Sequence, residues 1–313
     1  MSGRDEVLIH KFPEEREVNQ MVEFGRILTA MVTPFNEDGE VDYQTAKNLA
    51  VKLVENGSDG LVIAGTTGES PTLTKEEKLK LFSTVVEAVG GKATVLAGTG
   101  TNDTKASVEF TKEAERTGID GVLLVSPYYN RPPQEGLYQH FKKVAEATAL
   151  PVMIYNIPSR TGINITPATM SRLAEIDNIV ALKESAGDLN QAAEMVHVLP
   201  KDFLVYSGDD SMTLPILSVG GAGVVSVASH LVGRRMETMI EHFHQGDVEK
   251  AAKLHQELLP LFKVLFITAN PIMVKAALNL LGIPVGTTRL PLIGPQANEL
   301  DQLKEILQQL GLR

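Results

Sequence analysis

The chain has 313 residues, 43% of them hydrophobic and 22% charged, and a formal net charge of -10 at pH 7. This composition is typical of a globular protein with a large core, and the negative charge argues against nucleic acid or an anionic membrane as the main partner. The absence of cysteine excludes disulfides, thiolate zinc sites and cysteine nucleophiles, and it fits a cytoplasmic location. No hydrophobic stretch reaches the length of a membrane span, and residues 1–24, which lack a signal-peptide core, are interpreted as an N-terminal extension.

Short hydrophobic runs of β type recur along the chain, and each is followed by an amphipathic stretch. The predicted strands cover residues 27–32, 60–64, 94–97, 121–125, 151–155, 179–183, 203–206 and 223–227. They begin about 20 to 34 residues apart, which is close to the size of a βαβ unit. Eight such units predict a (β/α)8 TIM barrel over residues 25–232. An open doubly wound sheet is the alternative, but no glycine-rich dinucleotide motif follows the first strand.

Strand signals end near residue 233. Helical patterns then cover residues 236–244, 248–267, 271–281 and 297–310, and Asn270-Pro271 separates two of them. The pattern predicts a C-terminal helical domain over residues 233–313, packed as an appendage on the barrel.

Lys183 ends the sixth predicted strand, and active sites of such barrels form where strands end at the C-terminal face. An amine buried there loses hydration, which disfavours its charged form, and a neutral amine can attack a ketone to form a Schiff base. The alternative is a lysine that reaches solvent or pairs with a carboxylate.

Polar motifs follow other predicted strands. Thr66 and Thr67 lie in a glycine-rich turn that could grip a carboxylate or be a simple turn. Tyr155 and Arg160 could supply a proton carrier and a carboxylate clamp, or be a core tyrosine and a surface arginine. Tyr129 lies in a proline-rich loop, where interface packing is the common role of an aromatic residue.

Two further polar groups are expected to be structural or inert. Asp209 and Asp210 are expected to cap the helix that begins near Ser211. The seven histidines are scattered, so no metal site is predicted.

Five motifs, taken in chain order, resemble those of the dihydrodipicolinate synthase family, also called 4-hydroxy-tetrahydrodipicolinate synthases. This family belongs to the N-acetylneuraminate lyase superfamily of class I aldolases. The motifs are GTTGES at 65–70, YYNRP at 128–132, YNIPSRTG at 155–162, KE at 183–184 and SGDD at 207–210. The resemblance extends over about residues 25–292, nearly the whole chain beyond the N-terminal extension.

The resemblance implies that Lys183 forms an imine with pyruvate, whose carboxylate the Thr66–Thr67 turn would hold. Thr67, Tyr155 and Tyr129 would form a hydroxyl relay for protons. In relatives the tyrosine that matches Tyr129 comes from a neighbouring subunit, which implies a homodimer or homotetramer.

The resemblance also assigns the second substrate. Arg160 would bind the carboxylate of L-aspartate-4-semialdehyde, and Gly208 and Val225 would line the pocket near the imine. The implied enzyme is a Schiff-base-forming lyase of lysine and diaminopimelate biosynthesis that needs no metal or organic cofactor.

Other functions stay open at this point. A sister aldolase, such as an N-acetylneuraminate lyase or a 2-keto-3-deoxy-sugar-acid aldolase, would use the same lysine, but Arg160 favours a short aldehyde that carries a carboxylate. A barrel that binds a 2-oxo acid without catalysis and a phosphate-binding isomerase are more distant alternatives. Where lysine-inhibited relatives carry histidines and a glutamate, this chain has Lys75, Lys78 and Ala106, which predicts weak or absent inhibition by L-lysine.

Overall fold

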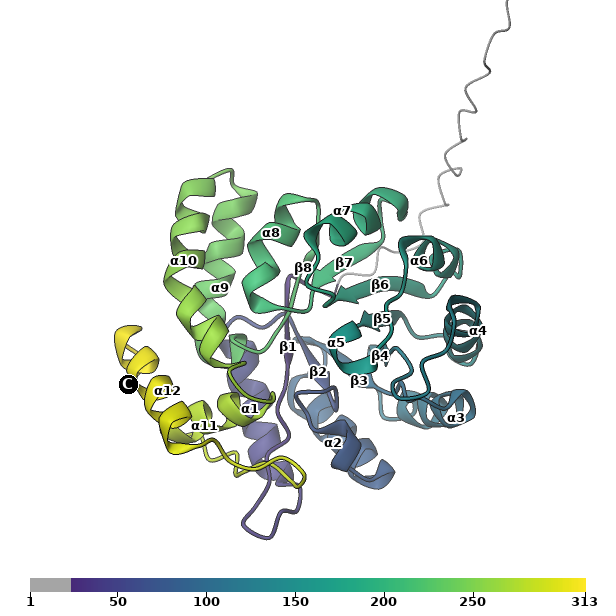
Figure 1. The fold of residues 1–313 in the computed structure, drawn as a ribbon. Helices are drawn as coiled ribbons and strands as arrows, with labels where there is room; N and C mark the ends of the chain where they lie inside the picture. Colours follow the sequence, from purple (N-terminus) through teal and green to yellow (C-terminus); the bar gives the residue numbers. More distant parts are fainter. Residues whose placement is uncertain (1–23) are drawn as a thin grey trace, which may run out of the picture.

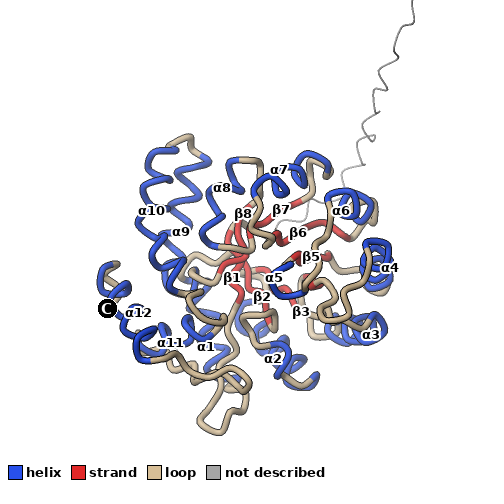
Figure 2. The backbone as a smooth tube through the Cα atoms, viewed as in Figure 1, coloured by secondary structure: helices blue, strands red, loops and turns tan. Residues whose placement is uncertain are grey.

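The computed structural model describes residues 24–313, so the predicted N-terminal extension lies outside the described residues except for Phe24. Within the described part, eight parallel strands close into a barrel in chain order, with helices around them (Figure 1, Figure 2). Leu28 and Val225 are paired where the first and last strands close the barrel. The predicted fold class is therefore confirmed. The strands are β1 (Ile27–Ala30), β2 (Gly60–Ile63), β3 (Thr94–Gly98), β4 (Gly121–Val125), β5 (Val152–Asn156), β6 (Ile179–Glu184), β7 (Leu204–Ser207) and β8 (Gly223–Ser226).

Most of the connecting helices lie outside the barrel. Asp42 caps the first of them through the backbone N–H of Thr45, and Thr74 and Glu77 form a capping box at the second. Such caps satisfy backbone donors that the first turn of a helix leaves free, so these helices start where the sequence provides a cap. The helices are α1 (Tyr43–Glu55), α2 (Lys75–Val89), α3 (Thr104–Glu115), α4 (Gln134–Ala145), α5 (Pro158–Thr161), α6 (Pro167–Leu173), α7 (Leu189–Val198) and α8 (Thr213–Ser218).

The barrel interior is filled by side chains that alternate along the strands. Leu28, Met153 and Tyr206 belong to this buried cluster. Phe24 joins it from the residues just before β1, and the Tyr206 hydroxyl donates to the carbonyl oxygen of Gly25 at 2.7 Å. The end of the barrel at which the strands begin is thus closed, which leaves the opposite end for a site.

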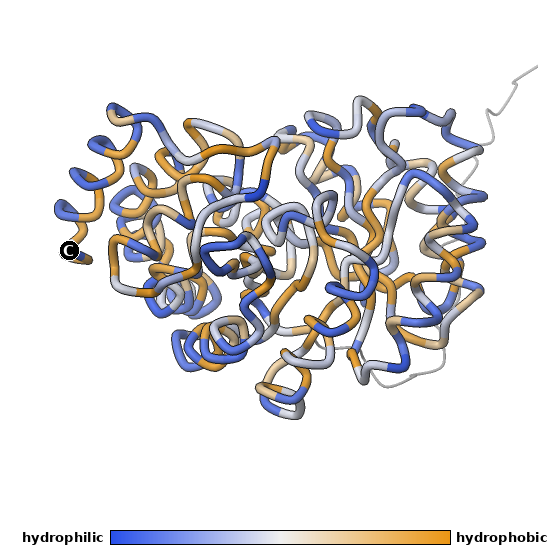
Figure 3. The backbone as a smooth tube through the Cα atoms, turned by 90° about the horizontal axis from the view of Figure 1, so that it is seen from below, coloured by the Kyte–Doolittle hydropathy of each residue, from blue (hydrophilic) through white to orange (hydrophobic). Residues whose placement is uncertain are grey.

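Four helices follow β8: α9 (Ser229–His244), α10 (Val248–Val264), α11 (Ile272–Leu280) and α12 (Ala297–Gln309). Figure 1 shows α9 beside the barrel and α12 at the outer edge of the molecule. The hydropathy colours change along each turn of α12 in Figure 3, and Leu303 and Leu307 are its buried residues. The predicted domain boundary at residue 233 falls inside α9 and stays a prediction. Between residues 24 and 313, no helix combines the length and apolar character that crossing a membrane requires.

Candidate active site

Lys183 lies near the end of β6 with its side chain inside the barrel. The residue is 5% exposed, and its Nζ lies 4.1 Å from the centroid of the Tyr155 ring. Tyr155 on β5 is paired with Lys183 in register, and it is also buried. The amine therefore does not reach bulk water, and it lies against a phenol ring.

The carboxylate next to Lys183 in sequence does not face the amine. Successive side chains of a strand point to opposite faces, and Glu184 contacts Asn156, whose Nδ2 donates to both carboxylate oxygens at 3.2 and 3.0 Å. The backbone N–H of Ala186 and Nε2 of Gln191 donate to it as well, at 2.6 and 3.2 Å. Burial raises the pKa of Glu184 although these donors oppose the shift. Glu184 thus supports the outer face of β6 and leaves Lys183 unpaired by its neighbour.

The backbone at Gly208, directly after β7, passes close to the lysine stem. A Cβ at this position would lie 1.8 Å from Ser185 Oγ and 2.9 Å from Lys183 Cε. A side chain at this position would therefore displace the Ser185 hydroxyl and the stem of Lys183. Val225 on β8 is 1% exposed and belongs to the same interior cluster as Tyr155.

The turn after β2 carries Thr66 and Thr67, of which Thr67 is buried and Thr66 is half-buried. Ala64 and Glu69 flank the turn with φ of 52° and 56°. This left-handed conformation is unfavourable for residues other than glycine and persists only where the surroundings enforce it. The threonine turn therefore needs supports from outside its own segment.

Three supports come from the C-terminal part of the chain, and none of them was predicted from the sequence. Asn270 Nδ2 donates to Thr67 Oγ1 at 2.9 Å. Lys275 Nζ lies 2.7 Å from Glu69 Oε1, and the backbone N–H of Arg289 donates to Glu69 Oε2 at 2.9 Å. The sequence presents Asn270 only as part of an Asn-Pro helix break, because no local pattern reveals a contact across 203 residues.

Tyr129, in the loop after β4, is 90% exposed in the single chain. Its φ is 73°, and Arg131 in the same loop has a φ of 48°. The Arg131 guanidinium donates twice to the carbonyl oxygen of Gly162, at 3.1 and 2.9 Å, which ties the loop to the end of α5. The phenol of Tyr129 therefore lies outside the interior that holds Lys183.

Arg160 lies on α5, the short helix after β5, and its side chain is exposed. Figure 1 shows α5 beside the ends of the central strands and not in the outer ring of helices. Arg160 thus carries its charge on an element that flanks the open end of the barrel.

The two aspartates after β7 differ in role. Asp209 Oδ1 accepts from the backbone N–H of Ser211 at 2.8 Å, which is the expected cap. Asp210 is instead buried, where it accepts from the backbone N–H groups of Val227 and Ala228 at 3.1 and 2.9 Å. Burial raises the pKa of Asp210 to about 6. The prediction that both acids cap the helix is wrong for Asp210, which holds the segment after β8 in place.

A closed (β/α)8 barrel with a buried lysine amine near the C-terminal ends of its strands is the architecture of the Schiff-base-forming class I aldolases. The fold and the site together define this class of enzyme. Among residues 24–313, no group of three or more His, Cys, Asp or Glu side chains is arranged to hold a metal ion.

Comparisons with known proteins identify the family within this class of enzymes. The model of the Dihydrodipicolinate synthetase family matches residues 23–310. A 4-hydroxy-tetrahydrodipicolinate synthase of Desulforamulus reducens is 60% identical over 292 residues, which cover 93% of this chain and 99% of the relative. The chain belongs to the dihydrodipicolinate synthetase family.

Solved structures agree with that assignment. The dihydrodipicolinate synthase of Cyanidioschyzon merolae, solved with lysine bound, is 52% identical and superposes with a TM-score of 0.92 over 93% of this chain and 99% of that chain. A structure described as the first monomeric dihydrodipicolinate synthase variant is 42% identical, with a TM-score of 0.91 over 93% of this chain and 98% of that chain.

Proposed function

We propose that the chain is a 4-hydroxy-tetrahydrodipicolinate synthase of lysine and diaminopimelate biosynthesis that acts in the cytoplasm. It condenses pyruvate, held as a Schiff base, with L-aspartate-4-semialdehyde. The observation that carries the proposal is the Lys183 amine, buried inside the barrel 4.1 Å from the centroid of the Tyr155 ring. The 60% identity to a relative of that name supports the choice of substrates.

The chemistry follows from an amine that is buried inside the barrel. Lys183 Nζ attacks the ketone carbon of pyruvate, water leaves, and a protonated imine remains. The imine withdraws electrons, so a methyl proton of pyruvate leaves to give an enamine, which attacks the aldehyde carbon of the second substrate. These steps require no metal or organic cofactor.

Proton transfer and substrate binding are assigned to the residues around the amine. The Thr66–Thr67 turn binds the pyruvate carboxylate, and Arg160 binds the carboxylate of the semialdehyde. An isolated phenol has a pKa of about 10, so it needs neighbouring hydroxyls to pass protons at neutral pH. Thr67, Tyr155 and a Tyr129 from a neighbouring subunit form that relay.

The test of the amine is reduction with borohydride in the presence of pyruvate, followed by mass spectrometry of peptides. We expect a pyruvate adduct on Lys183 and none in Lys183→Ala, whereas Lys304→Ala, which removes an exposed lysine of α12, keeps the adduct. If the folded wild-type protein forms no adduct, the proposal is overturned, and the remaining interpretation is a barrel that binds 2-oxo acids without catalysis.

The second substrate is tested by turnover of pyruvate with L-aspartate-4-semialdehyde against pyruvate with mannosamine derivatives. Arg160→Ala should raise KM for the semialdehyde by about 10- to 100-fold, the equivalent of one charge-assisted hydrogen bond, while borohydride trapping of pyruvate is retained. Faster turnover with the sugar would instead assign a sister aldolase.

The shared site is tested by mixing two variants. Lys183→Ala lacks the amine and Tyr129→Phe lacks the phenol, so each alone should be nearly inactive. If Tyr129 acts in a neighbouring subunit, random pairing in a dimer restores about a quarter of the sites. A mixture that stays inactive after confirmed subunit exchange would place Tyr129 outside a shared site.

A further inference from the structure

Asn270 lies in the segment between α10 and α11, far from the threonine turn in sequence. It is 6% exposed, and its Nδ2 donates to Thr67 Oγ1 at 2.9 Å. Its Oδ1 is buried and has no hydrogen-bond partner among the described residues. The amide therefore makes one directed contact to the site and leaves its other polar atom unsatisfied.

A threonine hydroxyl has one proton to donate and lone pairs that accept, whereas an amide nitrogen only donates. In the contact with Asn270, Thr67 Oγ1 is the acceptor, so the proton of Thr67 is left for another acceptor. We propose that Asn270 is a positioning residue that sets the polarity of the Thr67 hydroxyl and thereby directs its proton into the relay with Tyr155 and Tyr129. This inference rests on the proposed role of Thr67 in forming the pyruvate imine.

The opposite orientation of the amide would have the opposite effect. It would turn Oδ1 toward Thr67, and the hydroxyl would then donate to Asn270 and leave the relay. The observed orientation keeps the hydroxyl proton free at the expense of a buried carbonyl without a partner, an arrangement that is unfavourable for stability. Unsatisfied polar groups of this kind are expected at sites where chemistry needs a fixed donor.

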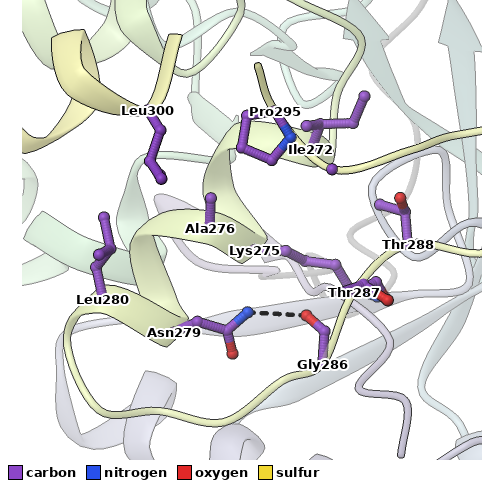
Figure 4. A pocket seen from close by; sticks show the side chains of 11 residues that line it. Ile272, Lys275, Ala276, Asn279, Leu280, Gly286, Thr287, Thr288, Pro295 and Leu300 are labelled. Atoms are coloured by element: carbon purple, nitrogen blue, oxygen red, sulfur yellow. Dashed lines mark hydrogen bonds between the residues drawn. The ribbon is translucent and has the colours of Figure 1, made fainter. Parts of the chain in front are cut away.

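Neighbouring contacts hold Asn270 and the turn at a fixed distance. Lys275, on the first turns of α11, reaches Glu69 and also donates to the carbonyl oxygen of Thr287 at 2.8 Å. Figure 4 shows the Lys275 stem running from α11 toward Thr287. The Arg289 guanidinium donates to Glu77 at 2.9 and 2.6 Å. The segment that carries Asn270 is therefore anchored to the turn that carries Thr67.

The test compares an isosteric change with a truncation. In Asn270→Asp the ionised carboxylate can only accept hydrogen bonds. The Thr67 hydroxyl would therefore donate its hydrogen bond to this carboxylate and not to the relay. Pyruvate imine formation, followed by borohydride trapping with pyruvate alone, should slow about 100-fold, the lower range of general acid–base contributions. Asn270→Ala frees the hydroxyl without reversing it and should slow the reaction by about tenfold or less.

The pH profile separates polarity from packing. Burial raises the pKa of a carboxyl, so between about pH 9 and 6 the side chain of Asn270→Asp becomes protonated and can donate again. Its rate relative to wild type should recover over that range, whereas the relative rate of Asn270→Ala stays flat. The control is Asn279→Asp on α11. The Asn279 amide donates to the carbonyl oxygen of Gly286 and not to Thr67 (Figure 4), so this variant should match wild type at every pH.

Two outcomes would overturn the inference. One is equal loss in the Asp and Ala variants with no dependence on pH, which would make Asn270 a packing residue. The other is wild-type imine formation in Asn270→Asp. Thermal melts report folding. If the Asp variant does not fold, Asn270→Ala decides alone: the rate of trapping at saturating pyruvate should fall while the pyruvate concentration that gives half of that rate stays nearly unchanged. A rise in that concentration alone refutes the idea. Because trapping uses pyruvate only, failure of the semialdehyde assay is a separate result.

Discussion

The buried pair of Lys275 and Glu69 joins α11 to the threonine turn, and its removal should be costly in a specific way. The two side chains are 2% and 1% exposed, and their charged atoms lie 2.7 Å apart. At an effective dielectric constant of about 20 this separation gives an attraction of about 6 kcal/mol. Burial nevertheless lowers the pKa of Lys275 to about 8, with Glu69 opposing the shift. The desolvation of the Lys275 amine therefore has a larger effect on its pKa than the attraction to Glu69.

This balance predicts different results for single and double replacement. Lys275→Met keeps most of the volume but leaves the Glu69 carboxylate buried with the backbone N–H of Arg289 as its remaining donor. The free energy of unfolding should fall by about 3 kcal/mol, the lower end of the range for one lost partner of a buried pair. Lys275→Met combined with Glu69→Gln should stay within about 2 kcal/mol of wild type, because no charge is then left uncompensated.

Urea unfolding followed by circular dichroism measures these differences, since the chain has no tryptophan for fluorescence. Lys304→Met is the matched control: it breaks an exposed pair with Asp301 on α12 and should change stability by less than about 1 kcal/mol. A single Lys275 variant as stable as wild type, or a double variant whose loss equals the sum of the two single losses, would refute the reasoning.

Three other results are expected. Gly208→Ala should slow trapping of pyruvate on Lys183, because the new Cβ would lie 1.8 Å from Ser185 Oγ and 2.9 Å from Lys183 Cε and would displace both; trapping at the wild-type rate would contradict this reasoning. Burial lowers the pKa of His230 from 6.5 to about 4. Between these two pH values the imidazole is protonated in the unfolded chain and neutral in the folded chain, so up to about 3 kcal/mol of stability is lost as the pH falls to 4. His230→Gln should flatten that part of a urea-stability curve against pH, and an unchanged slope would count against it. The expectation of weak or absent inhibition by L-lysine depends on the positive charges of Lys75 and Lys78, so titration with L-lysine should leave turnover largely unchanged, and strong inhibition at sub-millimolar lysine would disprove it.

The strands were predictable because strands of a parallel barrel are buried on both faces and therefore form continuous hydrophobic runs. Their ends were less predictable. β1 ends at Ala30, two residues before the predicted end, although Met31 N still donates to the carbonyl oxygen of Val62 at 3.1 Å. β6 extends one residue further, to Glu184. The ends depend on which backbone groups find partners on the neighbouring strand, and no single segment contains that information.

The residues of the candidate site also divide into those that the sequence could predict and those that it could not. Lys183 and Tyr155 could be placed from the sequence, since both end predicted strands and the barrel brings adjacent strand ends together. Asn270 and Lys275 could not, because they reach the turn after β2 across 203 and 206 residues of chain. Asp210 was misassigned for a related reason: its partners, Val227 and Ala228, belong to the next strand's loop and not to the local helix.

The supports of the threonine turn also follow an order in synthesis. All eight strands precede Asn270, Lys275 and Arg289 in the chain, so a ribosome joins the residues of the whole barrel before it adds these three. A chain that stops after α10 would contain Lys183 and Thr67 but none of the three residues that hold the turn after β2 from the C-terminal part. The braces of this turn are thus among the last residues to be made, although the turn itself is among the first.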